Sequence, residues 1–71
     1  MISYEPLWKT LNAREMTTYD LIFNHGFSSN KLHRMKHGKA ITTKTMDELC
    51  QILDCTVSEI IEYRIDEETG N

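Results

Sequence analysis

The side chains best suited to chemistry in this 71-residue sequence lie together, between residues 21 and 46. This stretch contains no acidic residue, and its cationic or titratable side chains are Lys31, Arg34, Lys36, Lys39, Lys44, His25, His33 and His37. The rest of the chain holds three basic residues and all eleven acidic ones, so a net charge of −3 conceals a stretch of +5 beside a remainder of −8. This segregation indicates that the stretch binds an anionic partner.

The spacing of the same residues argues against metal binding and catalysis. His33 and His37 are four residues apart, as two zinc ligands on a helix are. However, no third ligand lies nearby in the sequence, and Arg34 and Lys36 would repel a cation. The chain also has no glycine-rich phosphate loop and no GxSxG turn. We therefore expect no metal, no cofactor and no enzymatic activity.

Length and composition predict a single folded domain over residues 1–71, with a core from about residue 4 to residue 62. Hydrophobic residues make up 39% of the chain and charged residues 27%, and the longest apolar run, Leu21 to Phe23, has three residues. These values exclude a disordered chain, a membrane span and a signal peptide, so we expect a cytoplasmic protein. Cys50 and Cys55 do not form a CxxC pair, which favours two reduced thiols, with a disulfide between them as the alternative.

Helical periodicity and capping residues predict five short helices. The first covers about residues 4–14, with Ser3 as its cap. Thr42 caps a fourth helix, and Thr56 with Glu59 forms a capping box for a fifth.

The segment after the fifth helix alternates in polarity. Such alternation over residues 61–65 predicts a short strand, whose partner would be residues 1–4 of the same chain or of a second copy. The tail over residues 66–71 is acidic and is expected to fray.

The second and third helices are the ones that must position the basic stretch. The second begins at Thr17, in a capping-box-like Thr-x-x-Asp, and ends at Gly26. The third, over about residues 28–37, buries only Leu32 and Met35 and leaves its polar and basic side chains outside. Two such helices joined by a short turn that contains glycine form a helix-turn-helix.

These elements together resemble the phage repressor and Cro type of DNA-binding domain, often called XRE-like. The resemblance covers roughly residues 5–62 and is carried by the runs TTYDLI (17–22), HGFSSNKLHRM (25–35), Gly38-Lys39, Thr42 to Leu53 and Thr56 to Ile61. It implies an all-α, compact five-helix domain with possible short terminal strands, whose third helix enters the major groove of double-stranded DNA.

The resemblance also assigns roles to individual residues, and their chemistry suits those roles. Asn can pair with adenine, Arg with guanine and Ser with several base edges. The implied base contacts are Ser29, Asn30, His33 and Arg34. Hydroxyl groups, cations and helix N-termini bind phosphates, and the implied backbone contacts are Thr17, Thr18, Ser28, Lys31, Lys36, His37, Lys39, Thr43 and Lys44.

Two positions depart from the family pattern. Ile22 replaces a small residue of the second helix, and His25 replaces an aliphatic residue before the turn glycine. Both changes are expected to alter the angle between the second and third helices. The target sequence therefore does not follow from the resemblance.

The predicted function is sequence-specific binding of double-stranded DNA by a small transcriptional regulator, acting as a repressor. One such module buries little surface on DNA, so we expect a homodimer on a pseudo-palindromic operator. The fifth helix and the strand over residues 61–65 are the expected dimer surfaces. The alternative is a helix-turn-helix-shaped protein-interaction module or antitoxin-like subunit, in which the basic stretch is a solvated helix face.

Overall fold

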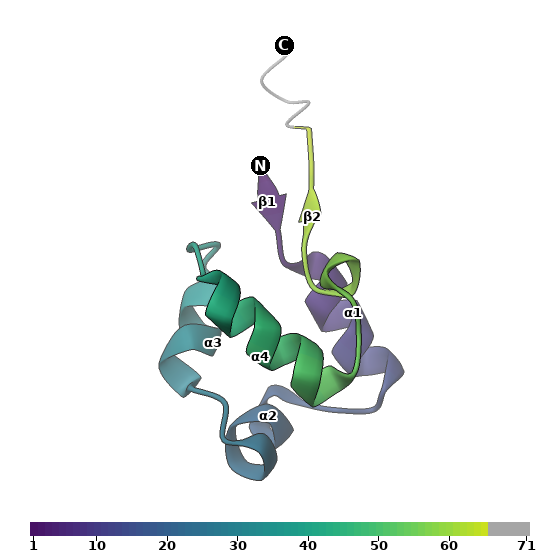
Figure 1. Ribbon diagram of the computed structural model, residues 1–71, viewed down its shortest axis with the longest axis vertical. Coiled ribbons are helices and arrows are strands. Elements are labelled where there is room, and N and C mark those ends of the chain that lie inside the picture. The colour runs from purple at the N-terminus through teal and green to yellow at the C-terminus, as the bar shows by residue number, and fades with distance from the viewer. Residues whose placement is uncertain (66–71) are drawn as a thin grey trace.

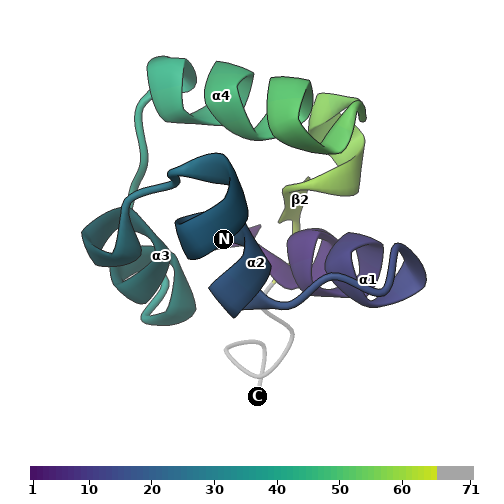
Figure 2. The same ribbon diagram turned by 90° about the horizontal axis from the view of Figure 1, so that it is seen from below.

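A computed structural model describes residues 1–65, and the acidic tail over residues 66–71, predicted to fray, lies outside the described residues. The elements in chain order are β1 (Ile2–Ser3), α1 (Glu5–Ala13), α2 (Thr18–His25), α3 (Ser29–Lys36), α4 (Thr43–Leu53), the 3₁₀ turn η1 (Val57–Glu59) and β2 (Glu62–Tyr63). α2 lies between α3 and α1, and α4 runs across one side of all three (Figure 2). The two strands lie together at one end of the molecule, and α2 lies at the other (Figure 1). None of the described helices is long and apolar enough to cross a membrane.

The core lies where the four helices and η1 meet. Leu32 and Met35 are the buried residues of α3, as the sequence predicts. Phe27, in the turn before α3, is almost completely buried and anchors that turn to the core. The buried hydrophobic residues are Tyr4, Leu7, Leu11, Leu21, Phe27, Leu32, Met35, Leu49, Leu53 and Ile60. Because every helix contributes to this cluster, the orientation of α3 depends on the packing of the whole chain.

The predicted caps Thr17 and Thr42 are confirmed by their hydrogen bonds. Thr17 Oγ1 accepts from the backbone N–H of Asp20 (3.1 Å), and the Asp20 carboxylate accepts from the backbone N–H of Thr17 (2.9 Å). Thr42 Oγ1 accepts from the backbone N–H of Thr45 (3.2 Å) in the same way. The predicted cap Ser3 is wrong, because α1 begins one residue later and Tyr4 occupies the cap position, although Ser3 Oγ still accepts from the backbone N–H of Glu5 (3.1 Å). Each bond satisfies a backbone donor that the first helical turn leaves free.

The predicted fifth helix is wrong, because the described residues contain four α-helices followed by a single 3₁₀ turn, η1. The capping interaction does form, since the Glu59 carboxylate accepts from the backbone N–H of Thr56 at 3.0 Å. Ile60 ends the turn and is fully buried, and β2 begins two residues later. Too few residues separate the cap from the strand for a second turn, so the capping box starts a helix that cannot continue.

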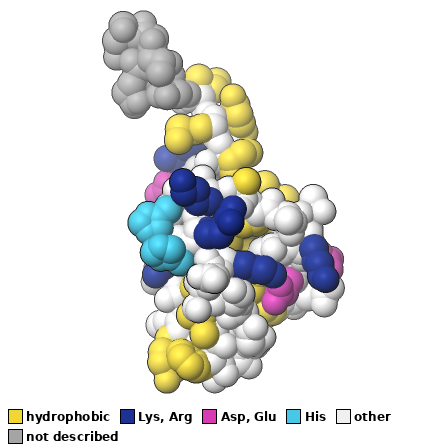
Figure 3. Space-filling model, turned by 90° about the vertical axis from the view of Figure 1, so that its left-hand side faces the viewer, with side chains coloured by type: hydrophobic (Ala, Val, Ile, Leu, Met, Phe, Trp, Pro, Cys, Tyr) yellow, Lys and Arg dark blue, Asp and Glu magenta, His cyan; other side chains and the backbone are white. Residues whose placement is uncertain are grey.

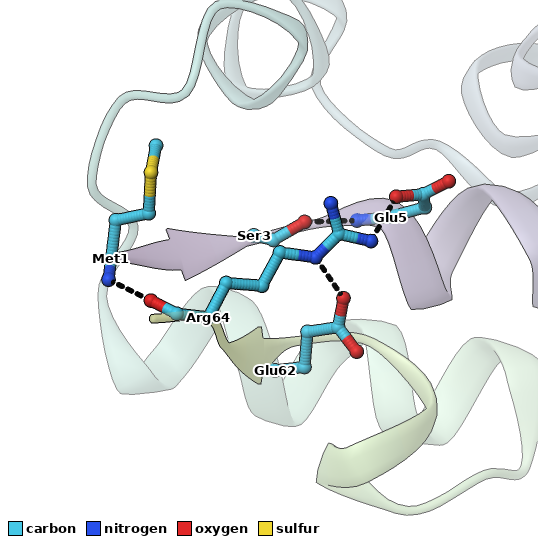
Figure 4. Close-up of polar contacts among 5 residues, drawn as sticks. All are labelled: Met1, Ser3, Glu5, Glu62 and Arg64. Carbon is cyan, nitrogen blue, oxygen red and sulfur yellow. Dashed lines mark hydrogen bonds and ion pairs between the residues drawn. The ribbon is translucent and has the colours of Figure 1, made fainter. Parts of the chain in front are cut away.

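The two terminal segments pair within the chain. β1 and β2 are antiparallel, with Ile2 opposite Tyr63 and Ser3 opposite Glu62, which identifies residues 1–4 of the same chain as the partner of the strand. Arg64, directly after β2, joins this segment to the start of α1, because its guanidinium binds Glu5, and it also donates to Glu62 of β2 at 2.6 Å (Figure 4). The hydrogen bond with Glu62 and the charge of Glu5 raise the pKa of Arg64. The Met1 amine donates to the Arg64 carbonyl at 2.6 Å.

Cys50 and Cys55 are free, half-buried cysteines. The backbone N–H of Cys55 donates to the carbonyl of Cys50 at 3.1 Å, closing the C-terminal turn of α4 around Asp54, which has φ +51°. Burial, reinforced by the neighbouring Cys50, raises the pKa of the Cys55 thiol. A raised pKa keeps this thiol protonated and unreactive near neutral pH.

Candidate nucleic-acid interface

The four predicted base contacts share one outward face of α3. Ser29 and His33 are four residues apart, as are Asn30 and Arg34, so the two pairs lie side by side along the helix. All four side chains are exposed, whereas Leu32 and Met35 on the opposite side are buried. α3 thus presents hydroxyl, amide, imidazole and guanidinium groups together, and the structure brings these four predicted residues into one surface.

The turn between α2 and α3 holds this face in place. Gly26 ends α2 at φ +70°, a left-handed conformation that glycine adopts without strain. The N–H groups of Gly26 and Phe27 then donate to the carbonyls of Ile22 (3.1 Å) and Leu21 (2.9 Å). Burial of Phe27 anchors the turn. The exposed face of α3 is therefore fixed by backbone hydrogen bonds and a buried ring.

Ser28, a predicted phosphate contact, begins α3. Its Oγ accepts from the backbone N–H of Lys31 at 3.3 Å, so the hydroxyl caps the helix. The first turn of α3 contains no acidic side chain, and its partial positive charge is therefore uncompensated there. A hydroxyl that accepts from the helix can still donate its own proton to an anion.

The end of α3 and the loop after it carry three of the remaining predicted residues, Lys36, His37 and Lys39. All three are exposed, and Gly38 at φ +72° turns the chain between them. The backbone N–H of Lys39 donates to the Arg34 carbonyl at 2.9 Å, which folds this loop back against the helix. Tyr4 fixes the loop from the other side.

Tyr4 is buried, and its hydroxyl donates to the Lys39 carbonyl at 2.6 Å. Burial raises the pKa of Tyr4, although the charge of Arg34 partly opposes the shift. The phenol therefore stays protonated and keeps its donor role at neutral pH. A contact between residues 35 positions apart thus sets the position of Lys39 relative to α3.

The other predicted backbone contacts lie at the N-termini of helices. Thr17 and Thr18 begin α2, and Thr43 and Lys44 begin α4. Thr17 is already engaged in the capping box, while Thr43 and Lys44 are exposed. On the side of the molecule that carries α3, Lys, Arg and His side chains gather across the middle of the surface (Figure 3).

Lys31 is the predicted contact whose surroundings the sequence did not indicate. Its Nζ lies 3.6 Å from Glu48 Oε1 of α4, and both side chains are partly exposed. A predicted phosphate contact is therefore paired with a carboxylate from beyond the basic stretch. Glu48 lies on the half-buried side of α4, which a helical wheel could have indicated, but its pairing with Lys31 depends on how α3 and α4 cross.

A second feature that the sequence reasoning missed is an aromatic pair on α2. Tyr19 and Phe23 are 64% and 66% exposed, and their ring centroids are 4.4 Å apart. The four-residue spacing, out of phase with the buried Leu21, was the available signal. These two exposed, mutually tilted rings form an apolar site on the end of the molecule opposite the strands.

Comparison with known proteins agrees with this geometry. Residues 6–66 match a family model described as the Cro/C1-type HTH DNA-binding domain. The chain is 37% identical over 62 residues to an uncharacterized HTH-type transcriptional regulator, YozG, of Bacillus subtilis (strain 168), covering 84% of this chain and 74% of the relative. It also resembles the crystal structure of the transcriptional regulator VanUg, with a TM-score of 0.81, 26% identity, and coverage of 92% of this chain and 87% of the other.

Proposed function

Because this chain belongs to the Cro/C1-type helix-turn-helix DNA-binding family, we propose that it regulates transcription by binding double-stranded DNA with α3 in the major groove. The observation that carries this proposal is the outward face of α3, where Ser29, Asn30, His33 and Arg34 are exposed together. Side chains of these types read base edges by hydrogen bonding. The whole of residues 1–71 acts as one cytoplasmic DNA-binding domain in this proposal.

The phosphate contacts surround this face at the starts of α2 and α4 and in the loop after α3. Lys39 and Lys44 supply full positive charges, and Thr17, Thr18, Ser28 and Thr43 supply hydroxyl groups near helix N-termini. Lys36, the last residue of α3, and His37 extend the cationic surface toward the loop. Lys31 reaches a phosphate by exchanging its 3.6 Å ion pair with Glu48 for the stronger charge of DNA.

A homodimer is the form in which we propose that the protein recognises its operator. One module of this size gives limited specificity, whereas two modules read half-sites about one helical turn apart. Val57, Tyr63 and Ile65 are exposed apolar residues near the strands, and they support this region as the contact surface. We assign repression as the regulatory effect, since a dimer on the major groove excludes other proteins from the same site.

A protein-interaction module remains the second candidate function, and the Tyr19–Phe23 pair is the observation that favours it. Exposed aromatic side chains are typical anchors of protein–protein contacts. In that case α2 and not α3 would carry the main interaction. The two functions predict different effects of salt.

The decisive experiment measures binding of the purified protein to a mixed-sequence duplex by fluorescence anisotropy at increasing salt. DNA binding predicts that the logarithm of the association constant falls linearly and steeply with the logarithm of the salt concentration, because several phosphates are neutralised. Flat or undetectable binding at low salt would contradict the proposal. A Phe23→Asp variant that keeps the wild-type slope would show that the aromatic pair is not needed for DNA.

A further inference from the structure

The C-terminal half of α3 and the following loop enclose a shallow hollow on the surface. Its lining consists of His33, Arg34, His37 and Lys39, so every side chain in it is cationic or can become so. Figure 3 shows histidine side chains lying directly beside a group of Lys and Arg side chains. Such a site is complementary to an oxyanion.

The hollow is held in shape mainly by a backbone hydrogen bond and by the Tyr4 hydroxyl. The backbone N–H of Lys39 donates to the Arg34 carbonyl at 2.9 Å, and the Tyr4 hydroxyl donates to the Lys39 carbonyl at 2.6 Å. The Arg34 guanidinium makes a long hydrogen bond of 3.4 Å to the Ala40 carbonyl, which directs it toward the loop. The imidazoles and the Lys39 ammonium are left for a ligand, while Arg34, the proposed base contact, adds its positive charge to the rim of the hollow.

The two histidines are in contact across the hollow. Their ring centroids are 4.4 Å apart, with the rings tilted by 60°. Two positive charges at this separation repel each other, and Arg34 and Lys39 add to the repulsion. A bound anion offsets this repulsion, because its negative charge attracts both imidazole rings when they are protonated.

Among residues 1–65, no carboxylate belongs to the lining. α4 faces α3 with Glu48, which is engaged with Lys31 at 3.6 Å. Tyr4, from the junction of β1 and α1, faces the loop as a protonated phenol. Lys36, the other cation on this part of α3, lines the adjoining hollow beside Trp8. The charge of this hollow is therefore set by two permanent cations and two histidines.

We propose that this hollow is a proton-linked phosphate site, in which His33 and His37 take up protons from solvent when a phosphate group binds. The ligand chemistry is a phosphate oxyanion, from the DNA backbone or from free phosphate. With DNA as the source, the inference rests on the proposed function and deepens it. Histidine is the side chain whose charge ordinarily changes between pH 5 and pH 8, so binding strengthens as the pH falls through that range.

The test compares DNA affinity at about pH 8 and about pH 6 at fixed ionic strength, for the wild type and for His33→Gln/His37→Gln. The wild type should gain roughly three- to tenfold in affinity on acidification, and calorimetry in two buffers of different ionisation enthalpy should detect proton uptake. Because His33 and His37 are themselves proposed DNA contacts, the double variant should bind more weakly than the wild type at the higher pH, and in addition it should lose most of the gain on acidification. The matched control is His25→Gln, because His25 lies on α2 outside the hollow and its loss should leave the gain intact.

The possible results distinguish failure of the proton-linked site from failure of the proposed DNA binding. DNA binding that is salt-dependent but insensitive to pH, or a pH effect retained by the double variant, overturns the proton-linked site and leaves DNA binding standing. If no DNA binding occurs at either pH, the proposed function fails, and titration with inorganic phosphate then decides the site. Movement of the His33 and His37 ring resonances in NMR spectra would assign the hollow to free phosphate, and unchanged resonances would overturn it.

Discussion

At the scale of single residues, the proposed interface assigns base reading and phosphate neutralisation to different side chains. Arg34 lies on the exposed face of α3, and Lys44 lies at the N-terminus of α4. A guanidinium on a guanine edge distinguishes one base from another, whereas an ammonium on a phosphate does not. Substituting Arg34 and substituting Lys44 should therefore change DNA binding in different ways.

Arg34→Ala should weaken binding to the selected operator by about 1 to 3 kcal/mol and relax the preference at one base pair. Lys44→Ala should weaken binding to all sequences alike and lower the salt slope by about one. Anisotropy titrations against operator and mixed-sequence duplexes at several salt concentrations measure both effects. Lys9→Ala, an exposed lysine of α1, is the control and should change neither. Equal effects of the Arg34 and Lys44 variants on operator and mixed sequence would contradict this division of roles.

Residue type and helical spacing predicted where the base-reading candidates lie, because their exposure depends only on which side of α3 carries Leu32 and Met35. The surroundings of these residues could not be predicted in the same way. The pairing of Lys31 with Glu48 and the hydrogen bond from Tyr4 to the Lys39 carbonyl depend on how distant segments pack. Short-range patterns carry no information about such contacts.

At the scale of elements, local chemistry determines where the helices begin and end. The length of η1, in contrast, is determined by the segments that pack against it. Caps at Thr17, Ser28 and Thr42 give the starts of α2, α3 and α4, and Gly26 gives the end of α2. The segment after Thr56 carries an equally good start signal but makes one turn only. Burial of Ile60 and pairing of β2 with β1 outweigh it, and neither is visible in a local pattern.

Substitution of Gly26 tests how much the left-handed turn between α2 and α3 contributes to stability. A Cβ at this position would meet no atom within 4 Å, so the cost of Gly26→Ala comes from backbone strain at φ +70° and not from a clash. The free energy of unfolding, measured by urea denaturation, should fall by about 1 kcal/mol. Gly26→Asn should lose less, because asparagine tolerates this conformation. An alanine variant as stable as the wild type would show that the turn relaxes to another geometry.

The cap of η1 makes part of the stability depend on pH. Hydrogen bonds from the Thr56 backbone N–H and hydroxyl lower the pKa of Glu59. A carboxylate with a lowered pKa in the folded state stabilises the protein above its unfolded pKa, and this contribution is lost as the pH falls through the folded value. Glu59→Gln should therefore be less stable than the wild type at neutral pH and equal to it in acid.

Chemical denaturation of both proteins over a series of pH values measures this difference. Glu15→Gln, which removes another exposed glutamate, is the control. A gap between Glu59→Gln and the wild type that stays constant into acid would exclude the carboxylate as its cause.

At the scale of the whole molecule, the chain separates two apolar surfaces at opposite ends of its long axis. Tyr63 and Ile65, 74% and 78% exposed, lie beside the strands, and the Tyr19–Phe23 pair lies on α2. The α3 face lies between them. A homodimer formed at the strand end leaves α3 of each copy free for its half-site.

This arrangement predicts that Ile65→Asp weakens self-association by about tenfold or more, since it places a charge in an apolar contact. Sedimentation velocity at high concentration, free and with operator, measures the change. Phe23→Asp, which adds the same charge at the other end, should leave the dimer intact. Monomers and one-to-one complexes alone in the wild type would rule out the homodimer.

The pairing of β1 with β2 joins residues about sixty positions apart through only two residue pairs. Closing so long a loop costs more entropy than two backbone pairs return, so this sheet cannot begin folding. α1 and η1 must pack first, through contacts such as the hydrogen bond from the Thr10 hydroxyl to the Glu59 carbonyl (2.7 Å), and bring the strands together. The helices thus form the folding nucleus, and the sheet forms last. In the native state the amides of β1 and β2 exchange with solvent by local opening, long before the helical core unfolds.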